Sequence, residues 1–137
     1  MKVVLDTNVL VSGIFFSGPP AEILKAWRNG YIQFALTSEI IDEYLRVGMI
    51  LAEKFSSIDI NPILTLIITR SEIVQSQPFP QQVCDDPDDD KFLACALSSE
   101  SEIIITGDRH LLKLSGYKGI TIVTPRAFIE RFLNKQS

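Results

Sequence analysis

The sequence predicts a three-layer α/β domain built on a central, mostly parallel sheet of about five strands. Short, continuous apolar runs, such as those within Lys2–Asp6 and Glu102–Thr106, are typical of parallel strands that are buried on both faces. These runs alternate with longer segments whose apolar residues recur at three-and-four spacing, the period of an amphipathic helix. Strands that alternate with helices favour βαβ units and therefore parallel pairing.

The composition indicates one globular domain spanning residues 1–137, because 46% of the residues are apolar and only 22% are charged. No apolar run approaches the ~20 residues that cross a membrane. An acid at position 6 comes too early for the apolar region of a signal peptide. Cys84 and Cys95 lack C-x-x-C spacing and fit a reduced interior, so we expect a soluble cytoplasmic protein.

The elements follow from local patterns. Strands are expected at Lys2–Asp6, Phe34–Thr37, Glu72–Val74, Glu102–Thr106 and Gly119–Val123. Helices are expected at Pro20–Asn29, Glu39–Phe55, Asn61–Thr69 and Pro125–Leu133, with one more directly after the aspartates of Asp85–Asp90. Ser38 is the expected N-cap of the second helix, and Thr7 and Asn8 are expected to form a turn after the first strand.

The stretch around Asp85–Asp90 is the strongest local signal in the chain. Five of these six residues are aspartates, and the segment Phe92–Leu97 that follows is entirely apolar. Pro87 lies near the expected helix start, where its missing N–H costs least. The pattern predicts an acidic turn that leads into a buried helix and that either caps this helix or holds a cation.

Three further acids lie where they can join this stretch. Asp6 and Asp108 follow strands, at the carboxyl ends where open α/β sheets bind ligands. Glu43 borders the apolar face of its helix. Carboxylates gathered in one place repel each other unless one is protonated or a cation neutralises them. A cluster of Asp6, Glu43, Asp90 and Asp108 therefore predicts a bound divalent cation.

Each acid also has a purely structural interpretation. The aspartates of Asp85–Asp90 favour a helix N-terminus electrostatically. Asp6 can form a turn, and Asp108 can cap the short turn before Leu111 and Leu112. Glu43 can be a solvated helix residue. Acids at the ends of two strands of one sheet favour a binding site over coincidence.

An ordered set of motifs carries a family resemblance. The motifs are V-V-L-D-T-N-V-L-V-S at Val3–Ser12, T-S-E-I-I-D-E-Y at Thr37–Tyr44, D-P-D-D-D-K-F-L-A-C-A at Asp86–Ala96, I-I-I-T-G-D-R-H-L-L at Ile103–Leu112 and I-T-I-V-T-P-R-A-F at Ile120–Phe128. In this order they cover nearly the whole chain, which resembles the PIN-domain ribonucleases, in the branch of the VapC-like toxins. The expected fold is therefore a PIN-like α/β/α domain.

The resemblance implies roles for individual residues. It implies that Asp6, Glu43, Asp90 and Asp108 hold Mg²⁺ or Mn²⁺, with Thr7, Asn8, Ser38 and Thr106 around them. Lys91, Arg109 and His110 are candidates for contacts to the substrate backbone. His110 stands where members of the family often carry an acid, which is a departure at the edge of the site.

The implied activity is metal-dependent hydrolysis of RNA phosphodiester bonds. The resemblance also implies a homodimer and, in the toxin branch, a cognate antitoxin. The net charge of −4 argues against a surface that coats nucleic acids generally. The alternative is a PIN fold without catalytic activity, kept as an RNA- or protein-binding module. A binding-only module has no need of a divalent cation, so metal binding separates the two interpretations.

Overall fold

A computed structural model of the chain describes residues 1–55 and 57–134, and its centre is one sheet in which every pairing is parallel. The sheet has five strands in the order β3-β2-β1-β4-β5. The strands are β1 (Lys2–Leu5), β2 (Gln33–Leu36), β3 (Glu72–Ile73), β4 (Ile103–Ile105) and β5 (Thr121–Val123). The predicted fold class and the predicted strands are confirmed.

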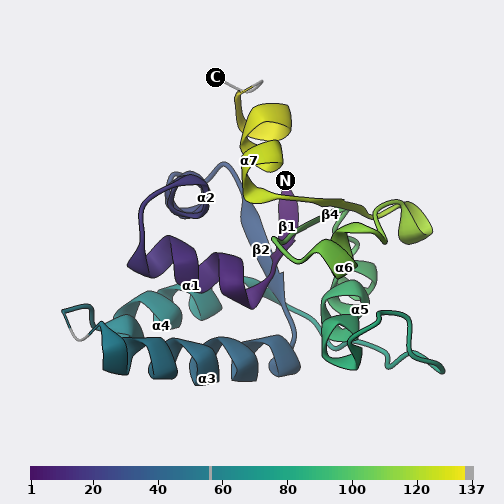
Figure 1. Ribbon diagram of the computed structural model, residues 1–137, viewed down its shortest axis with the longest axis horizontal. Coiled ribbons are helices and arrows are strands. Elements are labelled where there is room, and N and C mark those ends of the chain that lie inside the picture. Colours follow the sequence, from purple (N-terminus) through teal and green to yellow (C-terminus); the bar gives the residue numbers. More distant parts are fainter. Residues whose placement is uncertain (56, 135–137) are drawn as a thin grey trace.

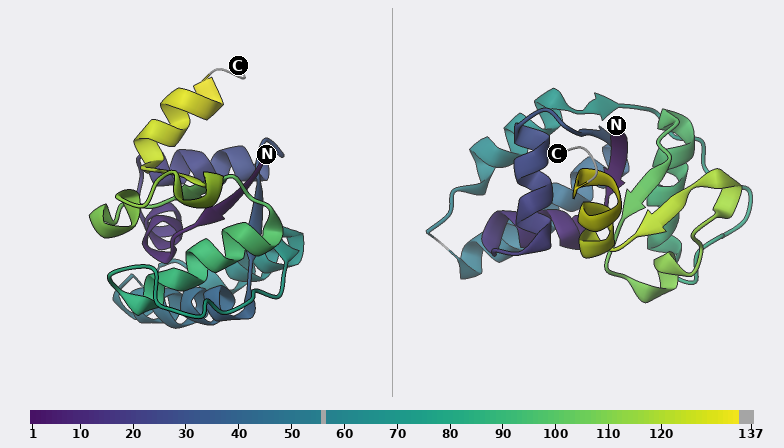
Figure 2. Two further views of the ribbon diagram at one scale, coloured as in Figure 1. Left: turned by 90° about the vertical axis from the view of Figure 1, so that its right-hand side faces the viewer. Right: turned by 90° about the horizontal axis from the view of Figure 1, so that it is seen from above.

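Helices cover both faces of this sheet. Within the described residues the helices are α1 (Thr7–Phe15), α2 (Pro19–Arg28), α3 (Ser38–Lys54), α4 (Ile60–Arg70), α5 (Asp90–Ser99), α6 (Arg109–Leu112) and α7 (Pro125–Phe128). Figure 1 shows α1 and α2 on one side of the sheet and α5 on the other, with α3 and α4 packed together below. Figure 2 shows the same three layers from two further directions. None of the helices described is long and apolar enough to cross a membrane.

Strand pairing determines which side chains meet at the carboxyl edge of the sheet. The central strand β1 pairs with β2 through Val3 and Phe34, and with β4 through Val3 and Ile103. Because these three strands are parallel, the residues that follow each of them emerge at the same edge. Asp6 follows β1 and Thr106 follows β4, so residues 100 positions apart in the chain become neighbours.

Two predicted details of the fold are wrong. The segment after β1 is a helix rather than a turn, because Asp6 serves as the N-cap of α1 and its carbonyl accepts the Val9 and Leu10 N–H groups. The helix α1 is rich in β-branched residues and is stabilised by burial of one face rather than by propensity. At α3 the N-cap is Thr37, whose hydroxyl accepts the Ile40 N–H at 3.3 Å, and Ser38 is the first helical residue.

The other predicted helices agree with the structure to within a few residues, whereas α6 forms where only a short turn was expected. The helix α4 occupies the segment predicted at Asn61–Thr69. The last predicted helix consists of α7 and a short π-helical segment, Ile129–Leu133. The acidic stretch forms a 3₁₀ turn, η1 (Pro87–Asp89), that runs directly into α5. Cys84 and Cys95 are buried and form no disulfide.

Tyr44 fastens α3 to the sheet beside the candidate site. Its side chain is fully buried, and its hydroxyl donates a hydrogen bond to the carbonyl of Leu5, the last residue of β1. This bond fixes the position of α3 relative to the strand that carries Asp6. Since Glu43 immediately precedes Tyr44, the same bond positions the Glu43 carboxylate.

We expect Tyr44→Phe to lower the free energy of unfolding by about 1–2 kcal/mol, because the variant leaves a buried carbonyl without its donor. Urea denaturation followed by circular dichroism measures the change. Tyr31→Phe is the matched control, since Tyr31 is 58% exposed. Equal stability of the two variants would contradict the proposed role of the Tyr44 hydroxyl.

Candidate active site

Asp6 is the buried acid at the centre of the site, with 6% of its surface exposed. The hydroxyl of Thr106 donates a hydrogen bond to Asp6 Oδ2 at 2.5 Å. The same Thr106 oxygen accepts the N–H of Asp108 at 3.0 Å. Thr106 is fully buried, so this one side chain fixes the first acid relative to the backbone that carries the second. The carboxyl ends of β1 and β4 thus form one rigid unit.

Asp89, the last residue of η1, lies beside Asp108. It was not one of the four site acids predicted from the sequence. The pKa of Asp89 is raised to about 7. The largest cause is burial, followed by the charge and the hydrogen-bonding contact of Asp108 and then by the charge of Asp6. Among the described residues, no hydrogen-bond partner reaches the buried oxygen Oδ2 of Asp89. Two carboxyl groups in this position share either a proton or a cation.

Asp6 experiences the same repulsion. Burial raises the pKa of Asp6, the Thr106 hydroxyl acts in the opposite direction, and the charges of Glu43 and Asp108 raise it further. The net direction is upward. Asp6, Glu43, Asp89 and Asp108 therefore act on one another electrostatically, and the raised pKa values of Asp6 and Asp89 favour a proton on these two acids in the metal-free protein.

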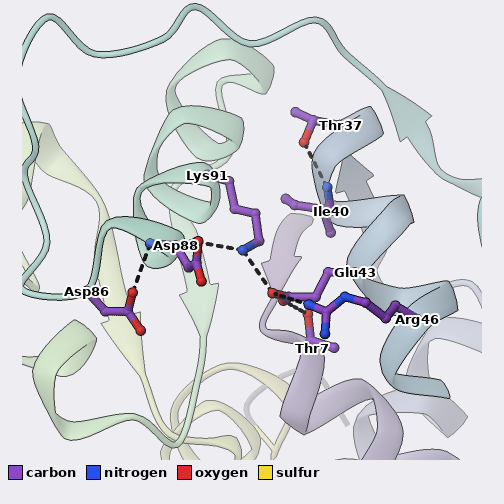
Figure 3. Close-up of polar contacts among 8 residues, drawn as sticks. All are labelled: Thr7, Thr37, Ile40, Glu43, Arg46, Asp86, Asp88 and Lys91. Carbon is purple, nitrogen blue, oxygen red and sulfur yellow. Dashed lines mark hydrogen bonds and ion pairs between the residues drawn. The ribbon is translucent and has the colours of Figure 1, made fainter. Parts of the chain in front are cut away.

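Within the described part of the chain, Glu43 is the one acid of the group with a cationic partner within hydrogen-bonding distance. Its carboxylate accepts a hydrogen bond from the hydroxyl of Thr7 at the start of α1. The ammonium of Lys91 lies 2.9 Å from Glu43 Oε1, and the guanidinium of Arg46 lies 3.8 Å away. Figure 3 shows how these side chains from α1, α3 and α5 point toward one another.

A cleft of about 490 Å³ opens beside Glu43, between α3 and η1. Its charged lining comprises Glu39, Asp42, Glu43, Arg46, Asp88 and Lys91. Acids outnumber basic residues in this lining by four to two, so an anionic ligand would need a cation to offset their charge.

Asp90 faces away from the other acids. Its two carboxylate oxygens accept the backbone N–H groups of Val83 at 3.0 Å and Cys84 at 2.6 Å. Partial burial acts to raise the pKa of Asp90. Hydrogen bonds from the Cys84 side chain and from these two backbone N–H groups outweigh it, so the pKa is lowered. The structure therefore places Asp90 as a brace between α5 and the preceding loop, and it places Asp89 beside Asp108.

The remaining predicted residues lie at the rim. Asn8 and Ser38 are exposed at the first turns of α1 and α3. Arg109 and His110 are exposed at the start of α6, where the Asp108 carboxylate accepts the His110 N–H at 2.9 Å. The His110 ring nitrogen Nδ1 also lies 3.4 Å from Asp85 Oδ2. Asp108 is thus both a cap of α6 and a member of the acidic group.

The sequence alone offered no means of choosing Asp89 over its neighbours. Successive residues of a helix point roughly 100° apart, so neighbouring aspartates at a helix start face different surroundings. The available signal was the excess of aspartates over the number that a cap requires. Which of them faces Asp108 depends on the exact residue at which η1 passes into α5.

The donor set fits a hard divalent cation, although it is not assembled into a cage. Within residues 1–55 and 57–134 no three acidic, histidine or cysteine side chains are already close enough to hold a metal ion. Three observations nevertheless fit Mg²⁺ or Mn²⁺. One oxygen of Asp89 has no partner among the described residues, the pKa values of Asp6 and Asp89 are raised, and all the donors are oxygen atoms.

The acids thus lie at the carboxyl edge of a parallel sheet, where open α/β folds bind their ligands. Comparison with known proteins gives the class: the PIN domain family matches residues 2–110, and the chain belongs to this family. PIN domains are generally nucleases and generally use divalent metals. The chain is also 34% identical over 146 aligned residues to the uncharacterized protein MJ1680 of Methanocaldococcus jannaschii, covering 96% of this chain and 92% of that protein.

The raised pKa of Asp89 predicts how stability depends on pH in the presence of EDTA. Between about pH 4 and pH 7 the folded protein keeps a proton on Asp89 that the unfolded chain has lost, because an unperturbed aspartate has a pKa of about 4. The unfolded state then binds fewer protons, so the free energy of unfolding falls as the pH rises toward 7 and levels off above it.

Urea denaturation at a series of pH values from 5 to 8 measures this slope. We expect Asp89→Asn to flatten it, and we expect Asp88→Asn, a change of the exposed neighbour, to leave it as in the wild type. Equal slopes in all three proteins would show that Asp89 titrates normally in the folded state.

The brace formed by Asp90 makes a separate prediction. Asp90→Asn replaces one of the two acceptor oxygens with an NH₂ group that cannot accept, so one of the hydrogen bonds from Val83 and Cys84 is lost and we expect a loss of about 1–3 kcal/mol in the free energy of unfolding. Denaturation in EDTA measures this loss. Unchanged stability would argue that the lost hydrogen bond contributes nothing to the fold.

Proposed function

We propose that this PIN domain is a divalent-metal-dependent ribonuclease that hydrolyses RNA phosphodiester bonds. The proposed metal-holding acids are Asp6, Glu43, Asp89 and Asp108, with Asp90 as the brace that positions α5. The observation that carries the proposal is the pairing of Asp89 with Asp108 next to buried Asp6, with one carboxylate oxygen left unpartnered. A fold that only bound RNA would gain nothing from mutually repelling acids that are buried or half-buried.

The chain's own residues support this chemistry in distinct ways. Thr106 and Thr7 orient the carboxylates of Asp6 and Glu43 through hydroxyl donors, so that their oxygens keep fixed directions. The Asp89 carboxyl group, with a pKa of about 7, exchanges a proton near neutral pH in the metal-free protein. A divalent cation held by these acids would polarise the scissile phosphate of the RNA and lower the pKa of a bound water.

The basic side chains at the rim are proposed contacts for the RNA backbone. Lys91 borders the cleft, and Arg109 and His110 lie exposed at the start of α6 next to Asp108. Phosphate contacts of this type position a strand without reading its sequence. Asn8 and Ser38 are proposed to support the site from the exposed first turns of α1 and α3.

The proposal extends to the biological setting that the resemblance to VapC-like proteins implies. In that setting the chain is a cytoplasmic toxin that acts as a homodimer and is held in check by a cognate antitoxin. The alternative remains a catalytically silent binding module, which the assay below separates from an enzyme.

The test combines end-labelled RNA with the purified protein and Mn²⁺ or Mg²⁺, with and without EDTA. We expect cleavage that EDTA abolishes and that falls at least about 100-fold in Asp6→Asn and Asp89→Asn, because each change removes a charged donor. Asp90→Asn tests the brace, and we expect it to retain most of the activity at a temperature where it is folded. Asp88→Asn is the matched control, and single-stranded DNA of the same sequence tests the preference for RNA.

The outcomes separate the interpretations. Cleavage that survives EDTA or both substitutions points to a contaminating nuclease. Loss of activity in Asp90→Asn with full activity in Asp89→Asn would assign the metal role to Asp90. Absence of cleavage together with absence of any effect of Mn²⁺ on thermal stability would leave the binding module as the better interpretation.

A further inference from the structure

Lys91 makes contacts that distinguish it from an ordinary surface cation. Its ammonium lies 2.9 Å from Glu43 Oε1 and donates to the Asp88 carbonyl oxygen at 2.6 Å (Figure 3). The side chains of Lys91 and Glu43 are only 17% and 18% exposed. An ion pair withdrawn from water to this extent is screened weakly by salt, and the loss of one partner leaves the other charge poorly solvated.

Arg46 provides an internal comparison, because it approaches the same carboxylate from the solvent side. Its guanidinium is 3.8 Å from Glu43 Oε1, one turn along the same helix, and its side chain is 66% exposed. Exposed pairs of this kind contribute little to stability. Neutralisation of Glu43 in this structure therefore depends mainly on Lys91.

The two contacts of Lys91 also join separate parts of the site. Glu43 belongs to α3, whereas the Asp88 carbonyl belongs to η1, the turn whose last residue is Asp89. The Lys91 ammonium thus links the acid on α3 to the turn that brings Asp89 beside Asp108. It pairs with the carboxylate of Glu43, one of the acids that the proposed function assigns to a divalent cation.

We propose that Lys91 is a built-in counter-cation that neutralises Glu43 in the metal-free protein and competes with the divalent ion for that carboxylate. Lys91 then sets the concentration of divalent ion at which the site fills. This inference rests on the proposed metal site, and it concerns a positioning residue rather than a catalytic one. Removal of a positive charge from the site also lowers the electrostatic cost of bringing in a divalent cation.

The test is a titration of Mn²⁺ into protein freed of metal with EDTA and then dialysed, measured by isothermal calorimetry and by the rise in melting temperature. Lys91→Met keeps the apolar stem but removes the charge. We expect Lys91→Met to melt at a lower temperature than the wild type without metal, to gain more on addition of Mn²⁺, and to bind Mn²⁺ about tenfold more tightly.

Two variants serve as controls. Lys91→Arg keeps the charge, and we expect it to bind Mn²⁺ with nearly wild-type affinity. Arg46→Met removes a charge from the exposed side of the same carboxylate, and we expect a change of no more than about twofold. Circular dichroism checks the folding of each variant without metal. A Lys91→Met protein that folds only when Mn²⁺ is present supports the proposal as well.

The outcomes distinguish this inference from the function on which it rests. Wild-type binding of Mn²⁺ that is lost in Asp6→Asn, together with equal or weaker binding in Lys91→Met, would overturn the role of Lys91 and leave the metal site standing. No binding of Mn²⁺ by either the wild type or Lys91→Met would overturn both. Tighter binding in Lys91→Met and Arg46→Met alike would show a general charge effect and would also refute the specific role.

Discussion

Repulsion between carboxylates at one edge of a parallel sheet is the constraint on which the rest of this structure depends. The pairing of β1 with β4 brings Asp6 and Asp108 to the same place, and η1 adds Asp89. Such a group is tolerated only if protons, hydrogen-bond donors or cations offset its charge. Here the hydrogen bond from the Thr106 hydroxyl and the ammonium of Lys91 each offset part of the negative charge, and the raised pKa of Asp89 favours a proton there.

The acids differ in how firmly the fold holds them. Asp6 directly follows a buried strand and is held by the fully buried Thr106, so its position is as rigid as the sheet. Glu43 and Asp89 lie on a helix and a turn that reach the site through individual contacts, those of Tyr44, Lys91 and Asp90 among them. The group of acids thus has two parts. Asp6 is fixed by the sheet, whereas the positions of Glu43 and Asp89 depend on a few polar contacts, and a bound cation would draw the oxygens of these two acids toward it.

Consecutive aspartates at the start of α5 have different tasks. Asp90 satisfies two backbone N–H groups of the preceding loop, and Asp89 joins the acidic site. N–H donors surround Asp90 and lower its pKa, whereas other acids surround Asp89 and raise its pKa. The same side-chain chemistry therefore behaves in opposite ways at adjacent positions, because the two carboxyl groups face different surroundings.

The sequence by itself determined the fold class, the five strands and the location of Asp6 and Asp108 after strands, because apolar runs and their period depend on local order along the chain. It did not reveal α1, whose β-branched residues become helical through burial, or the Thr37 cap. The tertiary structure alone decided that Asp89 rather than Asp90 faces Asp108 and that Lys91 pairs with Glu43. Those facts depend on the direction of single side chains and on contacts between residues far apart in the chain, and no periodicity encodes them.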